Sequence, residues 1–287
     1  MDTLNSEETW DQIIKPKSSL FNIGITQLWR YRDLLLLFVK RDFVALYKQT
    51  ILGPIWFFLQ PVISAIVFTI IFSYFAKMNT EDIPPILFYL GGLTLWNYFS
   101  ECLTKTSDTF IQNQNIFGKV YFPRLIIPLS VTLSGMLKLL IQFIVFLVCW
   151  SYYYFWQKNA YVHPQITILL FPVLILIMAG LSLGFGIIFS SLTTKYRDIR
   201  FLLQFAIQLM MYVSSVIIPL SQIPEKYRWV FKLNPVVAVI ETFKHGFLGT
   251  GIFDLFNLLY SFVFMVILIL VGLLLFNNAE KSFMDTV

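Results

Sequence analysis

Few side chains in this sequence are placed where they could carry out covalent chemistry. The two histidines, His163 and His245, lie far apart in segments expected to be loops, and the acidic pair Glu81 and Asp82 stands in a short turn with no histidine or cysteine near it. The sequence holds no HExxH, no clustered Cys and His ligands and no G-x-S-x-G. Solvation of loops explains these polar residues better than catalysis does. We therefore expect no catalytic residue and no metal site.

A nucleotide-binding site is not expected either. The pair Gly118 and Lys119 lacks the preceding glycine and the following Ser or Thr of a phosphate-binding loop. Cys102 and Cys149 lie in apolar surroundings, which suits small core residues better than a disulfide or metal ligands. The chain is expected to hold no cofactor of its own. If ATP drives its activity, another chain must bind the nucleotide and its Mg²⁺.

The composition is that of a membrane protein. Of the 287 residues, 57% are hydrophobic, 18% aromatic and only 13% charged, and the mean hydropathy is +0.73. Soluble domains carry about 25% charged residues, so the bilayer must be the solvent. The first sixteen residues are polar and lack the apolar core of a cleavable signal. The net charge of +5 comes without a basic run interleaved with aromatic residues. This excludes a nucleic-acid partner and favours lipid head groups and a cytoplasmic protein.

Six segments have the roughly 20 apolar residues that a spanning helix needs. The expected fold is an all-α integral membrane protein with six transmembrane helices. An interfacial amphipathic helix at 25–50 precedes them, after a polar N-terminus at 1–24. The transmembrane domain would occupy 51–277, and a short tail 278–287. The predicted spans are residues 51–76, 83–103, 125–156, 165–191, 200–219 and 255–276.

The distribution of basic residues predicts the orientation. With the N-terminus inside, fourteen Lys and Arg residues fall on the inner side and six on the outer side. Short cytoplasmic loops carry an excess of Lys and Arg. We therefore expect a multi-pass protein of the cytoplasmic (inner) membrane with both termini in the cytoplasm.

Two segments are expected to lie along the membrane. Residues 25–50 place apolar side chains near one helical stripe and basic ones on the polar sectors, as in interfacial helices; a short solvated helix is the alternative. The loop after the fifth span is too apolar to be free, and Pro224 and Pro235 divide it into two short helices. Helical turns satisfy their own backbone groups, so this pair could re-enter the outer leaflet.

The inner loop between the second and third spans has two interpretations. Amide side chains at 112–115 are followed by Lys119, Tyr121, Phe122 and Arg124. A polar segment pinned to the interface by aromatic residues could dock a partner. It could equally be a well-anchored turn.

Two helical stripes suggest a path for sugars. They mix aromatic rings with amides and hydroxyls at three- and four-residue spacing, and they comprise Trp56, Gln60, Ser64 and Phe68 on the first span and Phe201, Phe205, Gln208, Tyr212 and Ser215 on the fifth. Ordinary helix packing would also use amides. Lys138 lies deep in the third span, and inserting a charged lysine at the centre of a membrane helix costs about 3 kcal/mol. It could meet the phosphate of a lipid-linked substrate or pair with Glu101.

Four short stretches, in the same order along the chain, form a specific signal when taken together. They are YKQT at 47–50 with LGPIW at 52–56 and LQP at 59–61, KVYFPR at 119–124, KYRDIR at 195–200, and IPL at 218–220 with IPE at 223–225 and LNP at 233–235. The chain thereby resembles, from about Leu34 to Phe276, the ABC-2 type permeases that export polysaccharides, chiefly O-antigen, with the teichoic-acid permeases close by.

The resemblance implies a homodimer bound to two ATP-binding cassette subunits, exporting a polyprenyl-linked polysaccharide. It implies that the interfacial helix and the inner loop meet the ATPase, together with the turn at 196–198. The residues it assigns to that coupling are Asn115, Lys119, Tyr121, Phe122, Arg124, Tyr196, Arg197 and Asp198, and those of an outer gate are Pro224, Asn234 and Pro235. An ABC-2 drug or lipid exporter is the alternative, and a membrane enzyme acting on polyprenyl lipids a remote one.

Overall fold

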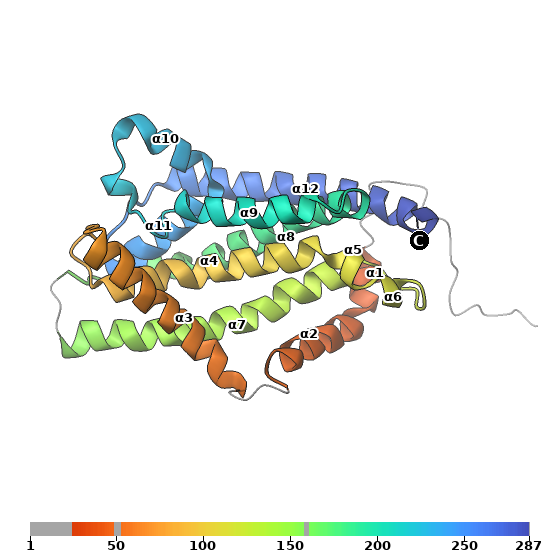
Figure 1. Cartoon of the computed structure of the whole chain (residues 1–287), viewed down its shortest axis with the longest axis horizontal. Coiled ribbons are helices and arrows are strands. Elements are labelled where there is room, and N and C mark those ends of the chain that lie inside the picture. Colours follow the sequence, from red (N-terminus) through yellow and green to blue (C-terminus); the bar gives the residue numbers. More distant parts are fainter. Residues whose placement is uncertain (1–24, 49–52, 158–160, 287) are drawn as a thin grey trace, which may run out of the picture.

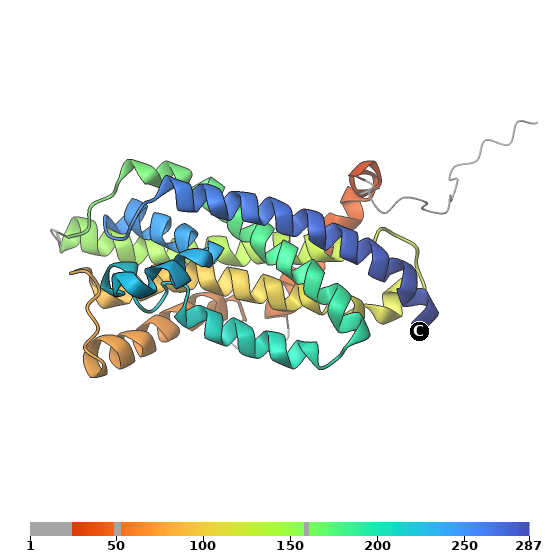
Figure 2. The ribbon, with the colours of Figure 1, turned by 90° about the horizontal axis from the view of Figure 1, so that it is seen from above.

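The structure is a computed structural model that describes residues 25–48, 53–157 and 161–286. Within these ranges the chain is built from helices joined by short turns (Figure 1). The long helices run side by side along the long axis of the molecule, and α3 crosses them obliquely (Figures 1 and 2). The long helices are α3 (Trp56–Phe68, continued by a π-helical segment, Thr69–Phe75), α4 (Pro85–Ser107), α7 (Ile126–Ser151), α8 (Phe171–Lys195), α9 (Ile199–Tyr212) and α12 (Leu255–Thr286).

The shorter helices gather at the two ends of this bundle. The helices α5 (Thr109–Gln112) and α6 (Gln114–Phe117) lie at one end, near the end of α12. The helices α10 (Glu225–Leu233) and α11 (Pro235–Leu248) lie at the opposite end. We call these the α5–α6 end and the α10–α11 end. Near the N-terminus, α1 (Ile25–Arg30) and α2 (Arg32–Tyr47) lie outside the bundle, where α2 packs against α7.

Local sequence explains where α11 begins and ends. Pro235 occupies the first turn of α11, where its missing N–H is not needed. The side chain of Asn234 caps the same helix by accepting a hydrogen bond from the N–H of Val236 at 3.1 Å. Gly249 ends α11 with a φ of 76°, a left-handed conformation that favours glycine. The two short helices predicted from Pro224 and Pro235 are therefore present; their depth in the membrane stays a prediction.

The centre of the bundle is α4, which packs against α3, α7 and α8. Its residues from Leu87 to Trp96 are all buried. A cluster of five phenylalanines fills the space between α7, α8 and α11, and it comprises Phe143, Phe146, Phe171, Phe243 and Phe247. On its other side α8 approaches α12 closely, because a Cβ at Gly272 would lie 2.6 Å from a side-chain carbon of Ile187. Small residues allow such close approach between helices in membranes.

Four of the six predicted spans are confirmed as apolar helices of membrane length within the described residues. They are Trp56–Phe75, Ile126–Trp156, Ile166–Lys195 and Leu255–Glu280. The other two predicted spans are also helical. However, α4 carries the charged residues Glu101 and Lys105, and α9 has only 14 residues, so neither is among the apolar helices of membrane length. The count of six crossings therefore stays a prediction.

Two predicted boundaries were wrong. The fifth span was drawn to residue 219, but α9 ends at Tyr212 and the chain turns from there to Pro219. The segment at 25–50 was drawn as one helix, but its described part breaks at Tyr31. The tail predicted at 278–287 is helical as far as Thr286, as a continuation of α12, and its place in the cytoplasm stays a prediction. Residues 49–52 of the first family-like stretch lie outside the described residues.

Candidate functional site

A polar groove of about 390 Å³ opens between α4 and α9. Its lining is unusual for membrane helices because it consists mostly of hydroxyl, amide and charged side chains. These come from two helices and comprise Ser100, Glu101, Thr104 and Lys105 on α4 and Gln204 and Gln208 on α9. They fall in pairs four residues apart, Ser100 and Thr104, Glu101 and Lys105, and Gln204 and Gln208, so on each helix they share one face. Of the six, the sequence pattern had singled out Gln208 for a sugar path, although the spacing of Gln204 was equally visible.

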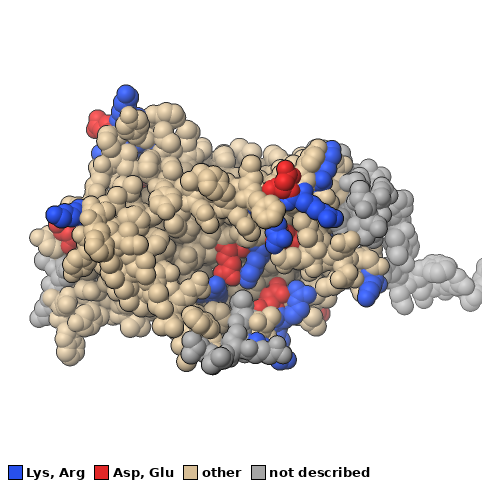
Figure 3. All heavy atoms as spheres, viewed as in Figure 1, with Lys and Arg blue, Asp and Glu red and all other residues tan. Residues whose placement is uncertain are grey.

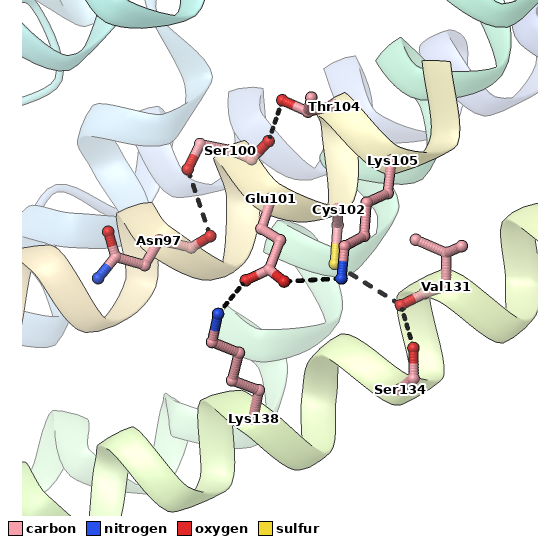
Figure 4. Close-up of polar contacts among 9 residues, drawn as sticks. All are labelled: Asn97, Ser100, Glu101, Cys102, Thr104, Lys105, Val131, Ser134 and Lys138. Carbon is pink, nitrogen blue, oxygen red and sulfur yellow. Dashed lines mark hydrogen bonds and ion pairs between the residues drawn. The ribbon is translucent and has the colours of Figure 1, made fainter. Parts of the chain in front are cut away.

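Glu101, which lines this groove, lies between two ammonium groups (Figure 4). Its carboxylate contacts Nζ of Lys138, from α7, at 2.6 Å and Nζ of Lys105, one turn along α4, at 2.8 Å. The pairing of Lys138 with Glu101, one of two roles considered for Lys138, is therefore confirmed. The contribution of Lys105 was missed, although its i, i+4 spacing from Glu101 could have revealed it.

The hydrogen-bonding capacity of the groove is only partly used within the chain. The hydroxyl of Ser100 donates to the carbonyl of Asn97, and that of Thr104 donates to the carbonyl of Ser100. The exposed carboxamides of Gln204 and Gln208 have no hydrogen-bond partner among the described residues. The groove can therefore offer amide and ammonium donors to a ligand.

The two predicted stripes lie on helices that both contact α4. On α9, Phe201, Phe205, Gln208 and Tyr212 are exposed, with Phe201 at 73% and Phe205 at 62%. On α3, Trp56 and Gln60 are exposed, whereas Ser64 and Phe68 are partly buried. Their role in a path stays a prediction.

Ser215 does not belong to the exposed stripe of α9. It is fully buried beyond the end of that helix, with a φ of 61°. The three- and four-residue periodicity was extended past Tyr212, where the helix had ended.

At the α5–α6 end, an ion pair joins α4 to α9. Asp108 is 2% exposed, and its carboxylate contacts a guanidinium nitrogen of Arg200 at 2.8 Å. The hydroxyl of Thr193, near the end of α8, also donates to the carbonyl of Ser107 at 2.9 Å. Three helix ends are thus tied together by polar contacts. Arg200 ends the KYRDIR stretch at 195–200, but the sequence analysis assigned a role to neither Asp108 nor Arg200.

The predicted coupling residues divide into exposed and buried ones. Asn115, Lys119 and Tyr121 of the loop and Tyr196, Arg197 and Asp198 of the turn are exposed. Phe122 and Arg124 are buried. A direct contact of these two with a partner therefore does not fit the structure, which gives them a different role.

Arg124 holds the loop to the end of α12. Its guanidinium donates to the carbonyl of Glu280 at 2.9 Å and lies over the rings of Phe110 and Phe117, with centroid distances of 5.9 and 5.4 Å. Such cation–π contacts stabilise a partly desolvated guanidinium. Burial lowers the pKa of Arg124, while nearby Glu280 and Tyr121 raise it.

At the α10–α11 end, a buried polar network joins the end of α9 to α11. The ammonium of Lys244 donates to the carbonyl of Ser215 at 2.5 Å and lies 3.5 Å from the centroid of the Phe88 ring. The hydroxyl of Ser215 donates to the carboxylate of Glu241, which also accepts the N–H of Ile252 at 2.9 Å. The sequence analysis had assigned no role to Glu241 or Lys244, although two charged residues in an apolar segment are a signal of a buried polar contact.

The residues predicted for an outer gate flank this network. Pro224 is exposed at the start of α10, and Pro235 is buried at the start of α11. The amide of Asn234 also donates to the carbonyl of Val213 at 3.1 Å, just beyond α9. Glu81, interpreted as a solvated loop residue, in fact accepts the N–H of Gly251 at 3.1 Å. A gating role for the three residues stays a prediction.

Among the described residues, no three His, Cys, Asp or Glu side chains gather as metal ligands would.

Comparison with known proteins places the chain in a family. The model of the family described as ABC-2 type transporter matches residues 33–248. The O-antigen export system permease protein RfbA of Klebsiella pneumoniae is 28% identical over 254 residues, which cover 88% of this chain and 94% of that relative. RfbA of Myxococcus xanthus is 24% identical, with 92% and 98% of the two chains covered. The polysialic acid transport protein KpsM of Escherichia coli is 23% identical, with 82% and 89% covered.

The family match agrees with the four membrane-length helices found in the structure. Because the matched region spans well over half of the 287 residues, this chain belongs to the ABC-2 type transporter family and is a multi-pass membrane protein.

Proposed function

We propose that this chain is the transmembrane permease subunit of an exporter that moves a lipid-linked, O-antigen-like polysaccharide outward across the cytoplasmic membrane. The observation that carries this proposal is the near full-length similarity to permeases of O-antigen export, with 88% of this chain and 94% of one relative aligned. The polar groove between α4 and α9 supports it, because hydroxyl and amide side chains suit the hydroxyls of sugars.

The assembly follows from the same proposal. Two copies of this chain would enclose the path, and each would bind one ATP-binding cassette subunit that hydrolyses ATP. The exposed residues of the α5–α6 end, among them Lys119, Tyr121 and Arg197, are the contact surface available to such a subunit. This end would face the cytoplasm, with both termini on that side. The chain itself would bind no nucleotide or cofactor.

Transmission from the ATPase to the path would run through α9. Its first turn holds Arg200, which is paired with Asp108 of the α5–α6 end. The chain beyond its last turn holds Ser215, which is bonded to α11. A shift at the turn 196–198 would therefore reach the α10–α11 end along one rigid helix, past the groove and the exposed aromatic face.

A combined genetic and biochemical test addresses the proposal. Deleting the gene should abolish the cell-surface glycan and leave its lipid-linked precursor inside the cell, and the purified chain should bring down an ATP-binding cassette subunit. Unchanged surface glycan together with no associated ATPase would refute the proposal. Stimulation of the ATPase by drugs or phospholipids, and not by lipid-linked glycan, would support a drug or lipid exporter of the same family.

A further inference from the structure

We propose that the groove between α4 and α9 binds the negatively charged phosphate of a lipid. Lys105, which lines the groove, would hold the phosphate, and Lys138, paired with the lining residue Glu101, would add its positive charge from behind. If that lipid carries the glycan, the inference rests on the proposed function, and the groove binds the phosphate that joins the lipid to the glycan. Where it is a membrane phospholipid, the site is independent of the exported cargo. The chemistry recognised is the same in both cases.

The first argument is the charge of the groove. The single carboxylate of Glu101 is shared by the ammonium groups of Lys138 and Lys105, which leaves one positive charge in excess. The side chains of Lys138 and Glu101 are only 15% and 25% exposed. An excess charge among apolar helices in a bilayer is costly, and an anion in the groove would offset it.

The second argument is the supply of donors. The free carboxamides of Gln204 and Gln208 stand one turn apart on α9, facing the groove opposite Lys105. A phosphate carries several strong acceptor oxygens, and charge-assisted hydrogen bonds from ammonium groups are stronger than neutral ones. A groove of about 390 Å³ has room for such a group.

The third argument is the depth of the groove. Glu101 stands six residues before Ser107, where α4 ends, so it lies about 9 Å inside the α5–α6 end. On the face shown in Figure 3, acidic and basic side chains gather toward that end, and much of the remaining face is uncharged. Lipid phosphates lie in the interfacial layer, just outside the hydrocarbon core. Toward the other end of α9, the exposed Leu209 and Tyr212 offer an apolar surface to a lipid tail.

The test measures lipid binding by the full chain in maltoside micelles, which contain no phosphate. Polyprenyl phosphate and phosphatidylglycerol are titrated separately, and bound lipid is counted by native mass spectrometry. Lys138→Gln leaves Glu101 and Lys105 as a neutral pair. The loss of a nearby positive charge should weaken lipid binding about tenfold. Glu101→Gln leaves two unneutralised ammonium groups and should strengthen it. The control Lys77→Gln, in the exposed turn at the opposite end, should bind as the wild type does.

The opposite signs of these effects separate a binding site from damage to the fold, since damage would weaken binding in both variants. Wild-type affinity in both Lys138→Gln and Lys105→Gln would overturn the proposal. Lysine-dependent binding that is tighter for polyprenyl phosphate supports a carrier site, and equal binding supports a phospholipid site. Failure of the chain to export glycan in cells would refute the proposed function without touching this result, because binding is measured on the purified chain.

Discussion

The ammonium of Lys244 donates a hydrogen bond of 2.5 Å to the main-chain carbonyl of Ser215. Lys244 is fully buried on α11, and Ser215 lies just beyond α9 with a φ of 61°. The left-handed region is costly for a residue other than glycine and persists where the surroundings enforce it. The ammonium and the carboxylate of Glu241 together hold Ser215 in this conformation, so they fix how the chain leaves α9.

Replacing Lys244 by Met should destabilise the α10–α11 end. The substitution keeps the apolar length of the side chain but leaves the buried carbonyl of Ser215 without its donor, at a cost of about 1–3 kcal/mol. Thermal unfolding of the purified chain in detergent measures the effect. Lys226→Met, on the exposed face of α10, is the matched control. Equal midpoints for the two variants would show that the contact contributes nothing.

The stability of the chain should depend on pH through Lys244. Burial lowers the pKa of Lys244 to about 8, against the opposing effect of Glu241 and then Glu81. Because the unfolded chain holds this proton up to its ordinary pKa of 10.5, it binds more protons than the folded chain between about pH 8 and that value. The free energy of unfolding should therefore gain a contribution that rises with pH across this window and is constant below it.

The measurement for this pH effect is a difference between two proteins. Unfolding midpoints of the wild type and of Lys244→Met are compared at pH 7.5 and at pH 9.5. The wild type should gain stability relative to the variant at the higher pH. A difference that is the same at both pH values would contradict the prediction.

The ion pair between Asp108 and Arg200 should show energetic coupling. Asp108 is buried and Arg200 is partly exposed, so the pair should be stronger than the 0–1 kcal/mol of surface pairs. We expect a coupling energy of about 1–3 kcal/mol in a double-mutant cycle of Asp108→Asn and Arg200→Gln. Unfolding in detergent provides the four free energies. As a control, Arg197→Gln is combined with Asp108→Asn, and their effects on the free energy of unfolding should add. Additive effects of Asp108→Asn and Arg200→Gln would contradict the prediction.

Buried and exposed residues of the inner loop should fail in different ways. Tyr121→Ala changes an exposed side chain and should reduce co-purification of the ATP-binding subunit without changing the unfolding midpoint. Arg124→Ala removes the link from the loop to Glu280 and should lower that midpoint. Buried charge-assisted hydrogen bonds contribute about 1.5–3 kcal/mol. If both variants unfold as the wild type does and lose the partner equally, Arg124 belongs to the contact surface after all.

Much of the fold follows from local sequence. Hydropathy summed over about twenty contiguous residues located the four long apolar helices, because membrane insertion depends on that local sum. Pro224 and Pro235 placed the two short helices α10 and α11, because proline has a defined place in the first turn of a helix. The four short stretches placed the chain in its family before any contact was known.

Other features depended on how the helices pack. Periodicity could not show that α9 ends at Tyr212 and that Ser215 turns inward to Lys244, because that turn is stabilised by contacts with α11. Likewise, the sequence could not show that Arg124 bonds to Glu280 of α12 or that Phe122 packs against Phe38 and Phe117.

The sequence by itself determined which segments are helical and apolar, since these properties depend on neighbouring residues. Only the tertiary structure brought Lys138 of α7 to Glu101 of α4 and placed Gln204 and Gln208 in one groove with Glu101. The physical reason is that contacts between distant helices depend on interhelical packing, as where Gly272 lets α12 approach Ile187 of α8.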